Sequence, residues 1–105
     1  MIVFWSSDPE ATSGVYGAGD GTIRRQWMEE LGIKVVHIDP YYNHTAALFP
    51  GKWLAPRPGT DSAMILALAH VWITEDLYDK DFVAYRSVGF DKWKEHVLGE
   101  DDGFP

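Results

Sequence analysis

Short apolar runs that end in polar turns divide the first half of the chain. Residues 1–5 form the first run, and residues 34–39 form a second run that ends in Asp39 and Pro40. Because proline cannot donate a hydrogen bond to a sheet, the second strand should end at about Asp39. A third, clipped strand is expected at residues 52–55. The pattern therefore predicts three strands, with residues 34–39 as the central one.

Helical spacing of apolar residues predicts a helix between the first two strands. It covers residues 23–31, with Asp20 or Thr22 as its cap and Gly32 as its stop. Its apolar side consists of Ile23, Trp27, Met28 and Leu31. The glycine-containing residues 10–21 are expected to form a flexible connection before it. A strand, a helix and a second strand in this order should give parallel strands with a right-handed crossover.

The most apolar segment of the chain is residues 62–74. It should form a helix capped by Thr60 or Asp61. Since this helix is apolar on nearly every side, it should be buried on more than one face, either in the core or against neighbouring domains.

Shorter elements complete the expected fold. A short helix or turn is expected over residues 41–48, capped helices after Asp79 and after Asp91, and a frayed end at residues 99–105. The order of elements predicts a three-layer, Rossmann-like α/β domain with a short parallel sheet flanked by helices. At 105 residues the chain has room for one such domain. Because it opens directly in a strand, we expect it to be a piece of a longer protein.

Composition and charge exclude several classes of protein. The chain is 46% hydrophobic and 14% aromatic, which indicates a folded core rather than disorder. It has no cysteine, so disulfides and thiolate metal sites are excluded. With a net charge of -7 and no basic stripe, neither nucleic acid nor a membrane surface is an expected partner. The histidines, His37, His44, His70 and His96, lack the spacing of a metal site, and His37 and His70 should be buried and hydrogen-bonded. The cellular compartment is not indicated.

A polar turn follows each predicted strand. The three turns are Ser6-Ser7-Asp8-Pro9, Asp39-Pro40-Tyr41-Tyr42 and Pro58-Gly59-Thr60-Asp61. Carboxyl ends of parallel strands meet at one edge of a sheet, where ligands bind in open α/β folds. Hydroxyls, backbone N–H groups and a helix start can hold phosphate and ribose there. Asp39 or Asp61 could accept both N1–H and the 2-amino group of guanine, and Tyr41 or Tyr42 could stack on a base or pterin ring.

Two other interpretations remain open. Asp61 before an apolar helix is more often only a cap, and Asp39 before Pro40 is more often only a strand end. In addition, the Gly17–Gly21 stretch precedes a helix, and Asp39 follows it by about 20 residues, as in a dinucleotide-binding fingerprint. Its G-x-G-x-G spacing and its distance from the first strand make that match weak. The alternative function is a stand-alone module that binds NAD or another nucleotide through the Gly17–Gly21 loop.

The order of the motifs resembles the dimethyl sulfoxide reductase family. The matching segments are Ser7-Asp8-Pro9, Ile38-Asp39-Pro40 with Thr45-Ala46, Arg57-Pro58-Gly59-Thr60-Asp61, Leu77-Tyr78-Asp79 with Phe82-Val83, and Gly89-Phe90-Asp91. The resemblance implies one α/β domain of a larger molybdenum or tungsten oxidoreductase that carries bis(molybdopterin guanine dinucleotide). It also implies partners, namely the remaining domains of the parent chain and an iron-sulfur subunit, and an isolated fragment that is inactive. The Ser-Asp-Pro and Ile-Asp-Pro-Tyr-Tyr variants are most similar to the branch that contains pyrogallol-phloroglucinol transhydroxylase.

By motif position, the resemblance implies that these turns hold the guanosine end of the cofactor. The implied contacts are Ser6, Ser7, Asp8, Asp39, Tyr41, Gly59 and Asp61, with Asp61 the better candidate for guanine. Two positions depart from the family pattern. Asp8 replaces the neutral amide of the usual Gly-Ser-Asn-Pro turn, and Tyr41 replaces the arginine that commonly follows Ile-Asp-Pro. The metal ligand and any iron-sulfur cysteines lie outside the matched stretch, so no catalytic or metal-ligating residue is expected here.

Overall fold

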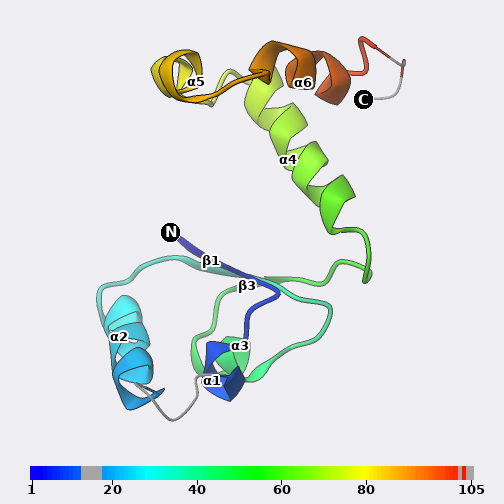
Figure 1. Ribbon diagram of the computed structural model, residues 1–105. Coiled ribbons are helices and arrows are strands. Elements are labelled where there is room, and N and C mark those ends of the chain that lie inside the picture. The colour runs from blue at the N-terminus through cyan, green and yellow to red at the C-terminus, as the bar shows by residue number, and fades with distance from the viewer. Residues whose placement is uncertain (13–17, 102, 104–105) are drawn as a thin grey trace. The chain divides into compact units, whose positions relative to one another are not determined.

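The computed structural model (Figure 1) describes residues 1–12, 18–101 and 103, with the backbone alone for residues 18–20. The chain divides into two compact units, Met1–Pro58 and Gly59–Pro105. Each unit has its own packing. The single domain expected over residues 1–105 stays a prediction.

The Met1–Pro58 unit contains a three-stranded parallel sheet. Its strands are β1 (Ile2–Trp5), β2 (Val35–Ile38) and β3 (Lys52–Leu54), in the order β1-β2-β3. In this register Phe4 lies opposite His37, and His37 lies opposite Trp53. The predicted parallel strands, with residues 34–39 in the centre, are confirmed. The α/β fold class with helices flanking a short parallel sheet is confirmed as well.

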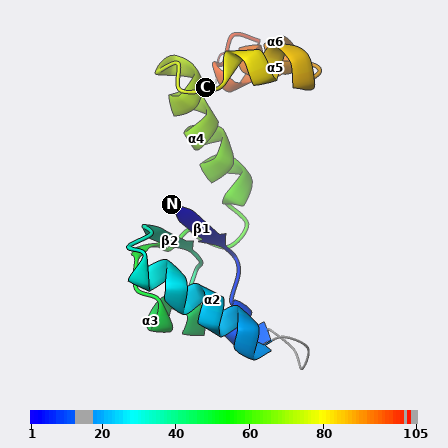
Figure 2. The ribbon, with the colours of Figure 1, turned by 90° about the vertical axis from the view of Figure 1, so that its left-hand side faces the viewer.

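Three helices belong to this unit: α1 (Pro9–Thr12), α2 (Ala18–Glu30) and α3 (His44–Leu48). In both Figure 1 and Figure 2 they lie below the sheet. The short α3 agrees with the helix or turn expected there. Gly32, with a φ of +65°, ends the segment after α2 as predicted, because glycine adopts this left-handed conformation without steric cost.

The prediction of a flexible connection over residues 10–21 was wrong in its described parts. The Asp8 carbonyl accepts hydrogen bonds from the backbone N–H groups of Ala11 (3.1 Å) and Thr12 (3.0 Å), and Pro9 is the first helical residue, a position that proline favours. Since α2 already begins at Ala18, neither of the two residues expected to cap it does so. The early start of α2 also changes the expected Gly17–Gly21 loop. Gly17 lies outside the described residues, and residues 18–21 are helical.

The side of α2 that was predicted to be apolar is largely exposed. Ile23, Trp27 and Leu31 are 46%, 55% and 75% exposed. The helix instead turns Arg25 toward α1, where the guanidinium pairs with the carboxylate of Glu10. A mostly buried ion pair therefore takes the place of the expected apolar contact.

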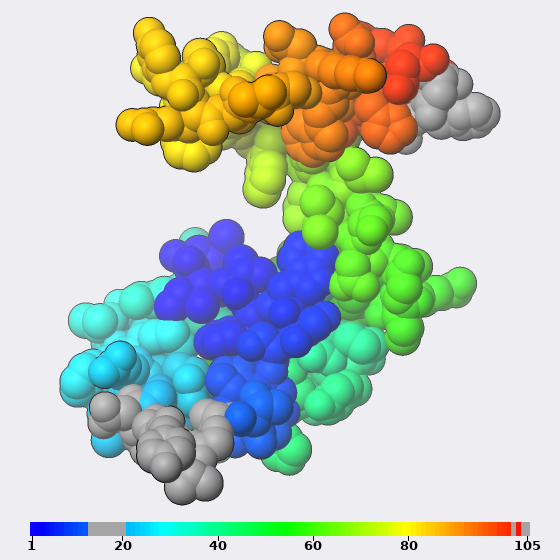
Figure 3. All heavy atoms as spheres, viewed as in Figure 1, coloured from blue at the N-terminus to red at the C-terminus, as the bar shows by residue number. Residues whose placement is uncertain are grey.

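The interior of this unit is partly polar. His37 and Thr45 are fully buried, beside Ile38 and Phe49. The His37 ring stacks on Phe4 at a centroid distance of 5.4 Å, and its Nε2 lies 2.8 Å from the Phe49 carbonyl oxygen. The predicted burial and hydrogen bonding of His37 are thus confirmed. Part of β1 stays at the surface, where Val3 is 45% exposed and the strand is visible in Figure 3.

The Gly59–Pro105 unit contains α4 (Asp61–Thr74), α5 (Lys80–Arg86) and α6 (Phe90–Val97). Figures 1 and 2 place α5 and α6 at the C-terminal end of α4. The core of this unit consists of Ala69, Ile73 and Val97, with Phe90 and Leu98 packed against it. None of the described helices is both long and apolar enough to cross a membrane.

Helix starts in this unit follow the predictions in two of three cases. Thr60 holds the cap position of α4 through its backbone carbonyl, which accepts from the Met64 N–H at 3.1 Å. Asp79 caps α5, and its side chain accepts from the Phe82 N–H at 2.8 Å. The expected cap of α6 was wrong: Gly89 holds that position, and Asp91 lies within the first turn.

Candidate functional site

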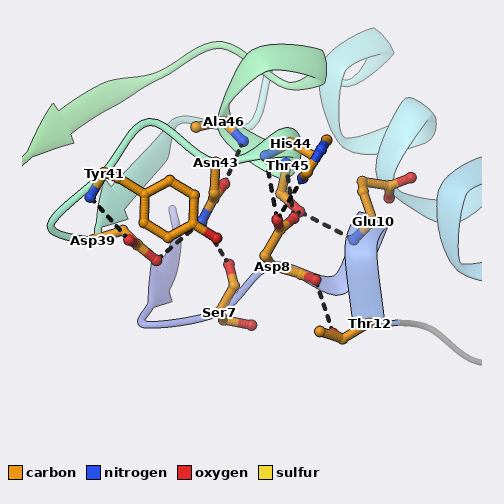
Figure 4. A network of polar contacts seen from close by, with 10 residues as sticks. All are labelled: Ser7, Asp8, Glu10, Thr12, Asp39, Tyr41, Asn43, His44, Thr45 and Ala46. Carbon is orange, nitrogen blue, oxygen red and sulfur yellow. Dashed lines mark hydrogen bonds and ion pairs between the residues drawn. The ribbon is translucent and has the colours of Figure 1, made fainter.

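The turns after β1 and β2 meet at the carboxyl edge of the sheet (Figure 4). The Ser6 N–H donates to the Ile38 carbonyl at 2.8 Å, and the Asp39 N–H donates to the Leu54 carbonyl at 3.1 Å. These bonds continue the sheet ladder to the point where the strands part. Polar side chains of both turns are therefore held side by side, as the positions of the strand ends predicted.

Asn43 joins the two turns. Its Nδ2 donates to the Ser7 carbonyl oxygen at 3.3 Å and to Asp39 Oδ2 at 3.1 Å. Its Oδ1 accepts from the Ala46 N–H at 2.9 Å, which makes Asn43 the cap of α3. The residue is 2% exposed. One buried amide thus connects the first turn, the second turn and a helix start.

The Asp8 carboxylate faces α3. It accepts from Thr45 Oγ1 at 2.7 Å, from the Thr45 N–H at 3.0 Å and from the His44 N–H at 3.3 Å, and His44 Nδ1 lies 3.0 Å away. Its side chain is 8% exposed. Burial raises the pKa of Asp8, but the hydrogen bonds from Thr45 and His44 outweigh burial and hold that pKa well below its ordinary value. The carboxylate therefore stays charged in neutral and moderately acidic solution.

Asp39 is also fixed by its own turn. Oδ1 accepts from the Tyr41 N–H at 3.1 Å, which is the geometry of an Asx turn, and Oδ2 accepts from Asn43. The Asp39 carbonyl accepts from Trp53 Nε1 at 2.9 Å. Because Asp39 is only 6% exposed, the carboxylate has one fixed orientation at the edge.

Aromatic side chains lie beside Asp39 at this edge. Tyr41, Tyr42 and Trp53 are 58%, 50% and 41% exposed. The Tyr42 hydroxyl donates to the Ala46 carbonyl at 2.8 Å, and its ring meets Trp53 edge to face at a centroid distance of 5.3 Å. Tyr41 is the most exposed of the three and has its ring available for a planar ligand.

The backbone of the first turn is strained at Ser6. Its φ is +46°, a region that costs a non-glycine residue roughly 1–2 kcal/mol. Such conformations persist where the surroundings fix them, and they are concentrated at functional sites. The Gly-Ser-Asn-Pro turn of the family that the sequence resembles has glycine at this position, which fits the observed φ.

A second layer of contacts supports the turns from below. Thr45 Oγ1 accepts from the Glu10 N–H at 3.1 Å, so α1 is attached to α3. The Glu10 carboxylate in turn accepts from Thr22 Oγ1 at 2.8 Å and pairs with Arg25. The first turn is therefore held on both sides by helices.

The structure brings together five of the seven residues expected at the cofactor. These are Ser6, Ser7, Asp8, Asp39 and Tyr41, all in the Met1–Pro58 unit. Gly59, with a φ of +82°, and Asp61, the first residue of α4, belong to the other unit, and their part in the site stays a prediction.

Sequence reasoning missed Asn43 as a residue of the site. An asparagine directly before His-Thr-Ala-Ala-Leu is a helix-cap signal and could have identified the start of α3. Its second role, as a donor to two turns, depends on a contact with Ser7, which is 36 residues away in sequence.

No group of three metal-ligating side chains occurs among the described residues. His96 Nδ1 lies 3.2 Å from Asp101 Oδ2, as an exposed pair. The expectation that the chain contributes no metal ligand stays a prediction.

Comparison with known proteins gives a consistent result. The family model described as molybdopterin oxidoreductase matches residues 1–97. The chain is 52% identical to the pyrogallol hydroxytransferase large subunit of Pelobacter acidigallici, over the whole chain and 12% of that protein. It is 39% identical to the dimethyl sulfoxide/trimethylamine N-oxide reductase of Rhodobacter capsulatus, over the whole chain and 13% of that protein.

A more distant relative adds to the same picture. A probable dimethyl sulfoxide reductase chain of Escherichia coli is 34% identical over 95% of the chain and 14% of its own length. The chain thus spans about an eighth of the length of these relatives, so other domains of the parent protein are implied. Because the family model covers nearly all of it, the chain belongs to the molybdopterin oxidoreductases of the dimethyl sulfoxide reductase family, in the branch that contains the pyrogallol transhydroxylase.

Proposed function

We propose that the carboxyl edge of this sheet holds the guanosine end of a molybdopterin guanine dinucleotide. Family membership implies a molybdopterin cofactor with molybdenum. The dinucleotide form, its presence in two copies and tungsten as an alternative metal belong to the proposal. The observation that carries it is the junction at Asn43, where the Ser7 carbonyl and the Asp39 carboxylate accept hydrogen bonds from the same buried amide.

The residues at this edge suit a nucleoside and its phosphates. The hydroxyls of Ser6 and Ser7 supply small donors at the strained first turn, where a phosphate or ribose oxygen would bind. Tyr41 supplies an exposed ring where the family commonly has a cation, so stacking replaces charge at this position. Asp39 supplies a fixed carboxylate, which can accept from ribose hydroxyls or from a base N–H.

The orientation of Asp8 supports the same proposal. A carboxylate pointing at a pyrophosphate would repel it, so an aspartate in the first turn must point elsewhere if a pyrophosphate binds there. The Asp8 carboxylate instead faces the start of α3 and is neutralised in part by four donors there. Its role in the proposed site is to hold the turn in place rather than to contact the cofactor.

For the Gly59–Pro105 unit the proposal concerns Gly59 and Asp61. Glycine at a φ of +82° allows the backbone to turn sharply before α4. Asp61 is our candidate for guanine, because a single carboxylate can accept from both N1–H and the 2-amino group. We further propose that the remaining domains carry the metal-ligating residue, that an iron-sulfur subunit is a partner of the parent enzyme, and that this chain alone has no oxidoreductase activity.

A titration of the isotope-labelled chain with GMP, GDP, AMP and NAD tests the proposal through the backbone amide shifts. We expect the guanine nucleotides to move amides next to Ser7, Asp39 and Asp61, and Asp61→Ala to remove this response. Asp79→Ala is the matched control, since it removes an aspartate from the start of another helix in the same unit. Shifts confined to residues 17–21 with NAD would favour the alternative function instead. An edge that responds to none of the four nucleotides would contradict a guanosine site in this chain.

A further inference from the structure

We propose that Asn43 is a positioning residue that sets the spacing between the first and second turns before any nucleotide binds. The inference deepens the proposed function and rests on it where nucleotide affinity is concerned. It concerns a residue that would not contact the cofactor, because Asn43 is 2% exposed and its amide already has partners on three sides.

The chemistry at this position is more demanding than a helix cap. Serine, threonine and aspartate cap helices about as well as asparagine. Of these four, only asparagine accepts a hydrogen bond with one atom and donates two with another. Asn43 uses all three: Oδ1 for the Ala46 N–H, and Nδ2 for the Ser7 carbonyl and the Asp39 carboxylate.

The two acceptors belong to segments that are distant in sequence. Ser7 lies 36 residues before Asn43, whereas Asp39 lies four residues before it. The strained backbone at Ser6 requires such an external constraint, because a left-handed serine would otherwise relax. If the amide donor is lost, both turns should therefore change together.

Two substitutions separate the roles of cap and donor. Asn43→Ser keeps a good cap and removes both donated hydrogen bonds. Asn43→Asp also keeps the cap but places a carboxylate against the Ser7 carbonyl and the Asp39 carboxylate. The ionisable groups around this position are Asp39 in its own turn, His44 at the start of α3, and Asp8, whose carboxylate contacts His44. Since two adjacent carboxylates raise the pKa of one of them, the Asn43→Asp pair should share a proton in mildly acidic solution.

The first measurement uses the 105-residue chain without nucleotide and compares backbone amide shifts. We expect Asn43→Ser to move amides in both residues 6–8 and residues 39–41. For Asn43→Asp we expect the same at about pH 7 and a return toward the wild-type shifts at about pH 5, because a protonated carboxyl can again donate. Asn43→Ser should not recover with pH. Changes confined to α3, or the same pH response in both variants, would overturn the positioning role.

The second measurement is the affinity for GMP. Loss of a hydrogen bond to a charged group should weaken binding by about tenfold in both variants at neutral pH, with recovery at lower pH in Asn43→Asp alone. Asp79→Ser, which keeps a cap on α5, is the matched control and should bind as the wild type does. Equal affinity in wild type and Asn43→Ser would also overturn the inference. If wild type itself does not bind GMP, the proposed function fails, while the nucleotide-free shifts still decide the role of Asn43.

Discussion

Asp8 carries a charge in a position where the family pattern has a neutral amide, and its contacts explain how the chain accommodates it. The carboxylate is nearly buried, which by itself disfavours the charged form. Thr45 and His44 together provide four donors at 2.7–3.3 Å, and their effect on the pKa exceeds that of burial. The charge is thereby directed to the start of α3, where it is favourable.

The depressed pKa of Asp8 predicts an acid-sensitive contribution to stability. The folded-state pKa lies below the unfolded value of about 3.9, so the unfolded chain binds a proton more readily. The stabilisation is therefore fully present above about pH 4 and is lost as the pH falls further. Urea unfolding, followed by amide signals of the Met1–Pro58 unit, should show a steeper loss on acidification in wild type than in Asp8→Asn. Asp79→Asn should keep the wild-type slope for this unit, and equal slopes for wild type and Asp8→Asn would contradict the assignment.

The helix α3 is too short to be stable by itself. It has five residues, and isolated helices of that length do not persist in water. Its position depends on Asn43 at the cap, on Asp8 across from its first turn, and on the fully buried Thr45. The element that organises the edge is thus itself held by the turns it connects.

Thr45→Val should destabilise this arrangement. The substitution preserves the shape of the side chain but leaves both Asp8 Oδ1 and the Glu10 N–H without their hydroxyl partner. We expect a loss of about 2 kcal/mol in the free energy of unfolding of this unit, and a higher Asp8 pKa. Thr45→Ser retains the hydroxyl and should keep the low pKa. A double-mutant cycle with Asp8→Asn should show an interaction energy of about 1 kcal/mol, and strict additivity would contradict a direct coupling.

Elements with strong local signals could be predicted from the sequence, and elements that depend on distant contacts could not. The three strands were predictable because each apolar run is followed by a turn that contains proline. The helix α1 was missed, because four glycines nearby suggested a loop although Asp8-Pro9-Glu10 is a helix-start pattern. The prediction of which side of α2 is buried was wrong, because it could not include the ion pair that Arg25 forms with Glu10, 15 residues away in sequence.

In the candidate site, too, only the features with a local sequence signal could be predicted. The first two turns were predictable, since parallel strands bring their carboxyl ends to one edge. The inward orientation of Asp8 was not, because it depends on Thr45, 37 residues away. Asn43 carried a local cap signal, but its bond to Ser7 could not be inferred from local sequence.

Apolar surface remains exposed in both units of the molecule. In the first unit it lies on α2, at Ile23 and Trp27, and directly after that helix, at Leu31. In the second it lies on α4, where within the described residues only Ala69 and Ile73 are buried. A helix that is apolar all round requires cover on several faces. The chain spans only about an eighth of the length of its relatives, so such cover is expected from the remaining domains.

We therefore expect the chain on its own to self-associate as its concentration rises. Trp27 and Trp72 are 55% and 54% exposed within these apolar surfaces. Trp27→Lys and Trp72→Lys should each shift the equilibrium toward monomer, because a charge disfavours burial of the surface. Tyr85→Lys, at an 84% exposed position on α5, is the control and should change association less. Sedimentation velocity over a range of concentrations measures this, and a chain that stays monomeric throughout would contradict the expectation.

Calorimetric titrations with GMP and IMP decide whether this chain holds guanosine as we propose. The two nucleotides differ only in the 2-amino group, which a carboxylate that also accepts N1–H would bind. We predict that wild type binds GMP about tenfold more tightly than IMP, and that Asp61→Asn abolishes the difference while Asp79→Asn retains it. Equal affinities for GMP and IMP in wild type, or no binding of GMP, would contradict the claim.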